Sequence, residues 1–129
     1  MILSNAYNYI NVLNKAADAG WHRNTVLTNN IANADTPNYK RQDVEFESYL
    51  LEAVHGNDSL DEAINKLDLD TLHSTTYLDR PNLSYRADGN NVDINTENVE
   101  LAKNQLKYYT LMDSMSQEFS RLKAALRTS

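Results

Sequence analysis

Histidines and clustered carboxylates are the side chains of this sequence that could do chemistry. His22, His55 and His73 share no helical spacing and form no HExxH pattern, so they do not predict a metal site. Two acidic clusters could in principle supply the paired carboxylates of a hydrolase. They are Asp58, Asp61 and Glu62, followed by Asp68 and Asp70. Nothing in the surrounding sequence predicts their burial, and we interpret them as solvated surface.

Other motifs with a chemical function are absent or incomplete. The segment DGNNVDINTE superficially resembles a calcium loop, but with Gly89 at the sixth loop position Ser84 and Arg86 occupy positions one and three, where carboxylates belong. Asn57 and Asn82 begin glycosylation sequons, a pattern short enough to occur by chance. The sequence has no P-loop, GxSxG or Rossmann glycine pattern, and no cysteine. We predict no catalytic residue, no cofactor and no metal, and a protein that is not an enzyme; a hydrolase built on the carboxylates is one alternative.

Length, composition and charge place the 129 residues in one ordinary domain. No run of about 18 apolar residues predicts a membrane span, and the N-terminal residues lack the basic and apolar regions of a cleavable signal peptide. Export would therefore need another route. The net charge of −6 does not favour a nucleic-acid binder. Residues 35–96 carry thirteen acidic and five basic residues, whereas both ends are nearly neutral and suited to packing.

Residues 1–33 have the seven-residue repeat of an amphipathic helix in a coiled coil. Half of the positions are small or polar, so the seam is weak. Asn24 is expected to weaken packing but to fix the register. The two rows are Leu3, Ile10, Ala17, Asn24 and Ile31, and Ala6, Leu13, Gly20, Leu27 and Ala34.

Residues 97–127 repeat the pattern and predict a second long helix. Thr96 is expected to cap it, with Glu97 and Glu100 near the positive end of the helix dipole and Lys123 and Arg127 near the other end. At 1.5 Å per residue each helix is roughly 45 Å long. The second stripe consists of Leu101, Tyr108, Met115 and Leu122, widened by Leu111, Met112, Phe119 and Leu126.

The predicted fold class is mainly α, with long N- and C-terminal helices pairing as an antiparallel coiled coil. Residues 1–34 and 97–129 form a discontinuous coiled-coil assembly domain, and 35–96 form an acidic, partly extended middle segment. Within it we predict short helices near 46–54 and 58–67. Because a lone helix pair buries little apolar surface for its ordering cost, we expect the stripes to need helices from other copies or other proteins.

The sequence TNNIANADTPNYKR, which begins at Thr28, predicts a helix stop with a rigid exit. Asn29 and Asn33 share a helix face that excludes Asn30, and such amides suit polar contacts across a tight interface. Pro37 keeps the preceding residue out of helical geometry and starts a turn in which the next residue tolerates a positive φ. An extended piece, YKRQDVEF, follows.

The stretch NNIANADTPNYKRQDVEF resembles the signature of the bacterial flagellar rod and hook proteins, in which N-x-A-N-x-x-T-P precedes an aromatic residue and lysine. The resemblance extends to DGNNVDINTE and the C-terminal helix, over roughly 1–50 and 77–127. Asn38 stands where the family mostly has glycine, and asparagine is the next best residue for a left-handed position. The motif falls on Asn30, Ile31, Asn33, Thr36, Pro37, Tyr39 and Lys40.

The resemblance implies a structural role. In this family the terminal helices pair, stack with neighbouring subunits in a helical tube, and are disordered before assembly. The implied function is a subunit of the flagellar proximal rod in the cell envelope, which polymerises to help transmit torque. The implied partners are other copies of itself, neighbouring rod proteins (FlgC-like), a rod-base adaptor (FliE-like) and the type III export apparatus, with no nucleic acid and no membrane insertion. A self-contained helical adaptor or export-chaperone-like binding module is the second alternative.

The residues expected to serve assembly and partner binding combine the two stripes with the family motif. They are Leu3, Ile10, Leu13, Asn24, Leu27, Asn30, Ile31, Asn33, Thr36, Pro37, Tyr39, Lys40, Leu101, Tyr108, Leu111, Met112, Met115, Phe119, Leu122 and Leu126.

Overall fold

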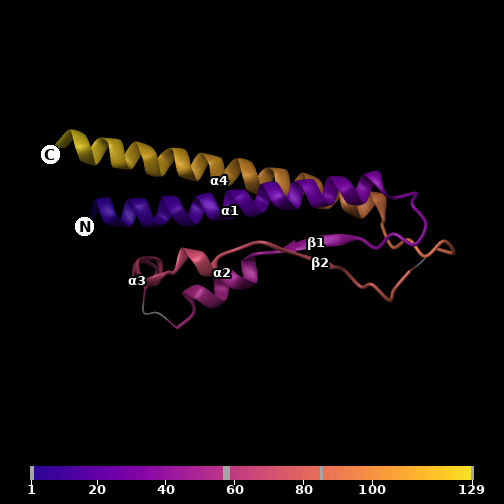
Figure 1. Ribbon diagram of the computed structural model, residues 1–129. Helices are drawn as coiled ribbons and strands as arrows, with labels where there is room; N and C mark the ends of the chain where they lie inside the picture. Colours follow the sequence, from indigo (N-terminus) through magenta and orange to yellow (C-terminus); the bar gives the residue numbers. More distant parts are fainter. Residues whose placement is uncertain (1, 57–58, 85, 129) are drawn as a thin grey trace.

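Two long antiparallel helices dominate the computed structural model, which describes residues 2–56, 59–84 and 86–128, with side chains between 6 and 127. The helix α1 (Ile2–Ala32) lies beside α4 (Ile94–Thr128), and the two chain ends lie at the same end of the molecule (Figure 1). The predicted mainly α fold, with the N- and C-terminal helices packed against each other, is confirmed.

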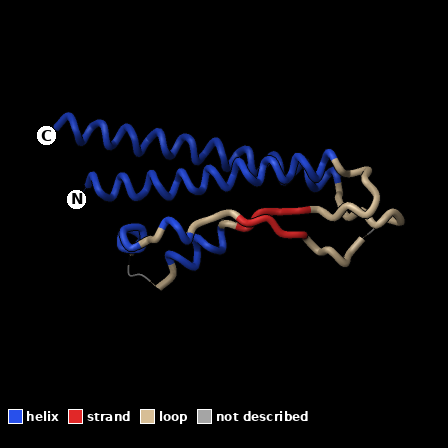
Figure 2. The backbone as a smooth tube through the Cα atoms, viewed as in Figure 1, coloured by secondary structure: helices blue, strands red, loops and turns tan. Residues whose placement is uncertain are grey.

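The middle of the chain runs back along α1 as short elements (Figure 2). Both short helices lie where the sequence predicts them, although the predicted start of the second, at Asp58, falls outside the described residues. The elements are β1 (Gln42–Glu45), α2 (Glu47–Val54), α3 (Leu60–Lys66), a 3-10 turn (Leu69–Thr71) and β2 (Thr75–Leu78).

The strands β1 and β2 form a two-stranded antiparallel sheet in which Gln42 lies opposite Leu78. Such a ribbon is marginal by itself, and α1 supports it. The Asn30 amide binds the N–H and the C=O of Gln42 at 2.9 and 2.7 Å, and Arg23 donates to the C=O of Val44 at 2.6 Å. These side chains therefore form hydrogen bonds with backbone groups of β1, as the backbone of a third strand would.

The apolar core forms two clusters along α1. The cluster near the chain ends joins α1 to α4 and contains Ala6, Ile10 and Leu122. The other joins α1 to the middle segment and contains Ala19, Phe46 and Leu72. Partly buried apolar side chains, among them Tyr49 and Leu50 of α2, pack against it. The helix α1 therefore buries one face against α4 and another against the middle segment.

The start of α4 differs from the prediction, because Thr96 does not cap it. The helix begins at Ile94, three residues before the predicted start, and the Asp93 carboxylate accepts from the N–H groups of Asn95 and Thr96 at 3.0 and 3.4 Å. The Thr96 hydroxyl instead donates to the same carboxylate at 3.1 Å. An ionised acceptor also meets the positive end of the helix dipole, which favours Asp93 over the hydroxyl of Thr96.

Candidate functional site

The predicted turn at the end of α1 is confirmed. The C=O of Thr36 accepts from the N–H of Tyr39 at 3.3 Å across Pro37 and Asn38, and Asn38 has a φ of 61°. A β-turn with a positive φ at its third residue favours glycine or asparagine there. The turn ends α1 and sends the chain back as β1.

A second turn, around Gly89, packs against the first. Asn38 donates its N–H to the C=O of Asp88 at 2.8 Å, and the Lys40 ammonium donates to the C=O of Gly89. Gly89 has a φ of 80°, and an added Cβ would lie 2.5 Å from the side-chain oxygen of Asn38. Glycine is therefore required here both for its backbone conformation and for the close approach of the two turns.

Asn90 closes the C-terminal end of α1. Its side chain is fully buried, and its amide nitrogen lies 2.9, 3.0 and 2.8 Å from the carbonyl oxygens of Asn33, Ala34 and Thr36. Arg86 donates to the Ala34 carbonyl as well. The carbonyls of the turn that follows the helix are thus bound by side chains some fifty residues away in sequence, in addition to the hydrogen bonds that the carbonyls of Asn33 and Thr36 accept from backbone N–H groups.

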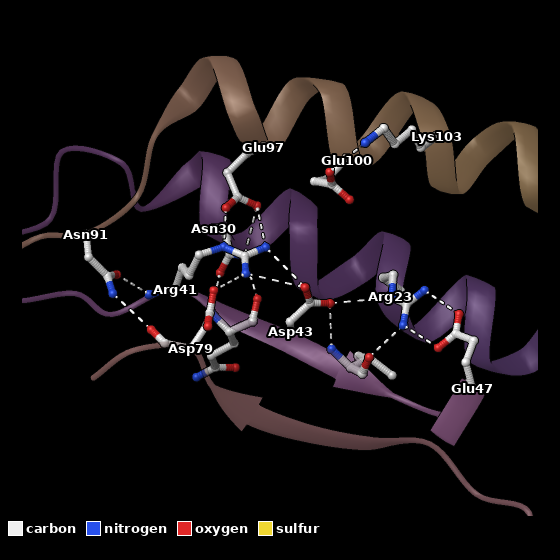
Figure 3. A network of polar contacts seen from close by, with 12 residues as sticks. Arg23, Asn30, Arg41, Asp43, Glu47, Asp79, Asn91, Glu97, Glu100 and Lys103 are labelled. Carbon is white, nitrogen blue, oxygen red and sulfur yellow. Dashed lines mark hydrogen bonds and ion pairs between the residues drawn. The ribbon is translucent and has the colours of Figure 1, made fainter. Parts of the chain in front are cut away.

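A buried polar network joins the end of α1 to the start of α4 (Figure 3). Asn30 is 0% exposed and Glu97 is 1% exposed. The Asn30 amide donates to Glu97 at 3.1 Å, and the Tyr39 hydroxyl donates to the Asn30 oxygen at 3.1 Å. Burial and the nearby Glu97 carboxylate raise the pKa of Tyr39, so its hydroxyl stays a donor.

Arg41 is the cation of this network. Its guanidinium pairs with Glu97 and, at 2.7 Å, with Asp79, and Asn91 accepts its backbone N–H at 2.6 Å. Burial opposes the charge, but the hydrogen bonds to Glu97 and Asp79 outweigh it and raise the pKa of Arg41. A buried carboxylate needs such partners, so Glu97 and Arg41 depend on each other.

A second ion pair attaches α2 to α1. Arg23 binds Glu47 through two nitrogens, at 2.7 and 2.8 Å, and lies 3.4 Å from Asp43. The Arg23 hydrogen bond lowers the pKa of Glu47 to about 2. The same hydrogen bond raises the pKa of Arg23. Bidentate arginine–carboxylate geometry fixes orientation as well as distance.

The residues that could do chemistry are not assembled into an active site. Asp61, Glu62, Asp68 and Asp70 are exposed, and Asp58 lies outside the described residues, so the described chain holds no buried pair from these clusters. Asp61 accepts from the Tyr9 hydroxyl at 2.5 Å, which raises the pKa of Tyr9 to about 12.

His22 and His73 contact neighbouring side chains within the protein. His22 lies 2.7 and 3.0 Å from the hydroxyls of Ser74 and Thr76, and His73 stacks on Tyr49. Within the described ranges, no group of three or more histidine, aspartate or glutamate side chains is placed to hold a metal ion. None of the helices described there is long and apolar enough to cross a bilayer.

The residues predicted for assembly divide into buried and exposed sets. Ile10, Leu27, Asn30 and Leu122 are buried in contacts within the chain. Met112, Phe119 and Leu126 are 37, 51 and 57% exposed, while Thr36 and Pro37 are also exposed. The side chain of Leu3 lies outside the described ones. The half-buried set is Leu13, Asn24, Ile31, Asn33, Tyr39, Lys40, Leu101, Tyr108, Leu111 and Met115.

Sequence reasoning missed several members of the network, namely Arg23, Arg41, Asn90 and Asn91, and treated Glu97 only as a first-turn acid. Arg41 directly follows the family motif, and the two asparagines directly follow Gly89. Their position directly after these motifs was the sequence signal that could have identified them. Their partners come from other parts of the chain, which no local pattern reveals.

Comparison with known proteins agrees with the geometry of the helix end. Residues 23–40 match the family model described as flagella basal body rod protein. The flagellar basal body rod protein FlgB of Bacillus subtilis is 38% identical over 102 residues, covering 78% of this chain and 79% of that protein. The FlgB proteins of Aeromonas hydrophila and Borrelia hermsii are 35% and 32% identical, and the matches cover 82% and 93% of their lengths.

The matched segment supplies side chains to the polar network that joins the end of α1 to the start of α4. It contains Arg23, Asn30 and Tyr39, and it ends just before Arg41. The resemblance first seen in the motif is confirmed by relatives at 30% identity or more that this chain covers for over two thirds of their length. The chain belongs to the FlgB family of flagellar basal body rod proteins.

Proposed function

We propose that this chain is a polymerising, non-enzymatic subunit of the flagellar proximal rod, placed in the cell envelope and exported without a cleavable signal peptide. The observation that carries the proposal is the large apolar side chains that the α1/α4 pair leaves exposed. Exposed apolar patches of this kind mark interfaces with other molecules. The side chains are Tyr7, Trp21, Leu106, Tyr109, Met112, Phe119 and Leu126, between 37 and 69% exposed.

Residues 1–34 and 97–129 form the assembly part in this proposal, and 35–96 face outward or bridge neighbours. The buried network around Asn30, Arg41 and Glu97 supports a rigid connection between the two parts, because fully satisfied polar networks rigidify the structure around them. A rod that helps transmit torque needs subunits that do not twist internally. The partners are other copies, FlgC-like rod proteins, the FliE-like adaptor and the type III export apparatus.

A helical adaptor or export chaperone is the second candidate. The pairing of α1 and α4 within one chain favours it, since the cluster of Ala6, Ile10 and Leu122 forms without another copy. The exposed Phe119 and Tyr109 do not separate the two candidates, because an adaptor or chaperone also binds its partner through apolar surface. Similarity to FlgB rod proteins over most of the chain favours the rod subunit. The two candidates differ in whether the chain remains in the finished structure.

The discriminating experiment measures the chain in purified basal bodies. Cells that lack it and regain it from a plasmid provide basal bodies for quantitative mass spectrometry with isotope-labelled peptides. A rod subunit is present at several copies per rod and survives salt washing, and cells without it have no rod. A chain found only in the cytoplasmic fraction, with rods of normal composition, would establish the adaptor instead.

A further inference from the structure

A groove of about 430 Å³ lies between α1, α2 and α4. Its floor on α1 is made of small residues, Ala16, Ala19 and Gly20, and its walls include Phe46 and Leu50 on one side and Leu106 on the other. Leu106 is 68% exposed although it lines the groove. A trough with a floor of small residues between apolar walls suits a ridge of larger side chains from another helix.

The opposite flank of α4 carries such a ridge. Met112, Phe119 and Leu126 recur every seven residues and are 37, 51 and 57% exposed. Thr110, which lines the groove, lies nine residues from Phe119. At 3.6 residues per turn these two side chains point about 180° apart. The groove and the ridge therefore face different directions, and the ridge of one molecule cannot fill the groove of the same molecule.

Charges of opposite sign flank the groove and the ridge. Within the groove itself, Glu47 is already paired with Arg23 and Lys107, so the charges that matter lie beside it. Residues 45–54, which contain α2 and the approach to it, hold three glutamates and no basic residue. Residues 119–127, at the C-terminal end of the ridge, hold three basic residues and no acidic one, although Arg121 pairs with Glu118 and points away from Phe119. Charges of opposite sign across a contact fix the register and disfavour wrong partners. The exposed charges left for the contact are Glu45 and Glu52 beside the groove, and Lys123 and Arg127 beside the ridge.

We infer that the C-terminal half of α4 of one copy docks in the groove of the next copy. Phe119 and its neighbours on the ridge cover the floor of small residues, and Lys123 and Arg127 face Glu52 of α2. The inference rests on the proposed function and specifies which two faces meet. Because the groove and the ridge are different surfaces, the contact is heterologous and repeats without closing into a dimer.

Disulfide trapping tests this contact, because the native chain has no cysteine. Thr110→Cys in the groove and Ser116→Cys beside the ridge are made as separate full-length chains, mixed and oxidised. A disulfide forms only where the two Cα atoms come within about 7 Å. The mixed dimer is expected to exceed either homodimer by about fivefold or more, and Phe119→Asp in the second chain abolishes it. Glu62→Cys on α3, an exposed site that does not line the groove, is the matched control.

Sedimentation of the same mixtures separates the two proposals. Self-association with mixed dimers no more abundant than in the Glu62→Cys control overturns the docking contact and leaves the rod function standing. If the purified chains do not associate, both variants are produced together in swimming cells and the disulfide is sought in isolated basal bodies. Its absence there also overturns the contact, whereas absence of the chain from basal bodies overturns the rod function itself.

A charge-reversal pair provides an independent check. Glu52→Lys on α2 is expected to reduce the mixed disulfide severalfold, and adding Lys123→Glu to the other chain restores it. Both side chains are exposed, so neither change disturbs the core. If Glu52→Lys reduces the mixed disulfide and Lys123→Glu does not restore it, the predicted pairing of Lys123 with Glu52 is contradicted.

Discussion

At the residue scale, Asn30 is the fully buried asparagine of the segment that matches the family model. An amide carries a donor and an acceptor in the arrangement of a peptide group, so one side chain can bind both the N–H and the C=O of Gln42. The same amide nitrogen donates to the buried Glu97, and the oxygen accepts from Tyr39. Asn29, next to it, is exposed. One position of the motif therefore connects α1, β1 and α4.

Replacing Asn30 with alanine leaves the Gln42 backbone and the Glu97 carboxylate without this partner inside the protein. We expect the free energy of unfolding to fall by about 3 kcal/mol, since each buried polar group left unsatisfied costs about 1–3 kcal/mol. Urea denaturation followed by circular dichroism measures the change. Asn29→Ala is the matched control and is expected to stay within about 0.5 kcal/mol of the native chain. Equal effects of the two substitutions would contradict the role of Asn30 in joining α1, β1 and α4.

At the element scale, the contact between α1 and α4 is a seam of mixed character. The residues of α4 that face α1 follow the alternating three- and four-residue spacing of a coiled coil, but Asn104 and Glu118 occupy two of the positions. Asn104 donates to the C=O of Gly20 at 2.8 Å, which fixes the register of the helices. The contact between the two helices therefore gains specificity from its polar side chains but buries little apolar area. Leu122 is its buried apolar contact nearest the chain ends.

Leu122→Asp tests the seam, because it puts a carboxylate against Ala6 and Ile10. An unpaired buried charge is among the most destabilising substitutions. We expect a loss of about 3 kcal/mol or more, frayed chain ends and no swimming in soft agar, with normal expression. Ser120→Asp introduces the same charge at an exposed position two residues away and is expected to swim normally. Unimpaired swimming of Leu122→Asp would refute the buried seam.

At the scale of the whole molecule, the acidic middle segment is attached to α1 by the core around Phe46 and by the ion pair of Glu47 with Arg23. It is attached to α4 by the ion pair of its own Arg41 with Glu97. The rest of its negative charge stays at the surface, where it is available for contacts with neighbouring copies. Attachment of the middle segment should therefore depend on pH through the carboxylates that the arginines hold.

The Arg23–Glu47 pair makes this dependence measurable. The pKa of Glu47 is lowered from 4.5 to about 2 in the folded chain. Its stabilising contribution is fully present above pH 4.5 and is lost as the pH falls toward 2. Because the Glu47 side chain is 56% exposed, solvent screening reduces the contribution to about 1 kcal/mol. Glu47→Gln is expected to be less stable than the native chain by this amount at pH 7 and equally stable near pH 2.

Chemical denaturation at several pH values checks the prediction. Glu52→Gln, on the same helix but outside the ion pairs seen among the described residues, removes an identical charge and should show no comparable difference at any pH. A gap between Glu47→Gln and the native chain that stays constant from pH 7 to 2 would mean that the ion pair does not contribute through ionisation.

The amino-acid sequence by itself determined the features that arise within a few residues. The apolar period produces the two long helices, the described residues of the acidic clusters in the middle segment stay exposed, and Pro37 with Asn38 forms the turn that follows α1. Backbone conformation and helical periodicity are local properties, so a sequence pattern is enough to predict them. The family motif is local as well.

Only the tertiary structure decided which of these residues are buried and what they bind. Asn30 meets Glu97 across 67 positions of sequence, and Arg41 meets the same carboxylate across 56. It also placed Asp93 rather than Thr96 at the cap of α4 and left Phe119 exposed on a flank of the seam. The free energy of such contacts depends on burial and on partners brought together by the fold, and neither is encoded in the spacing of neighbouring residues.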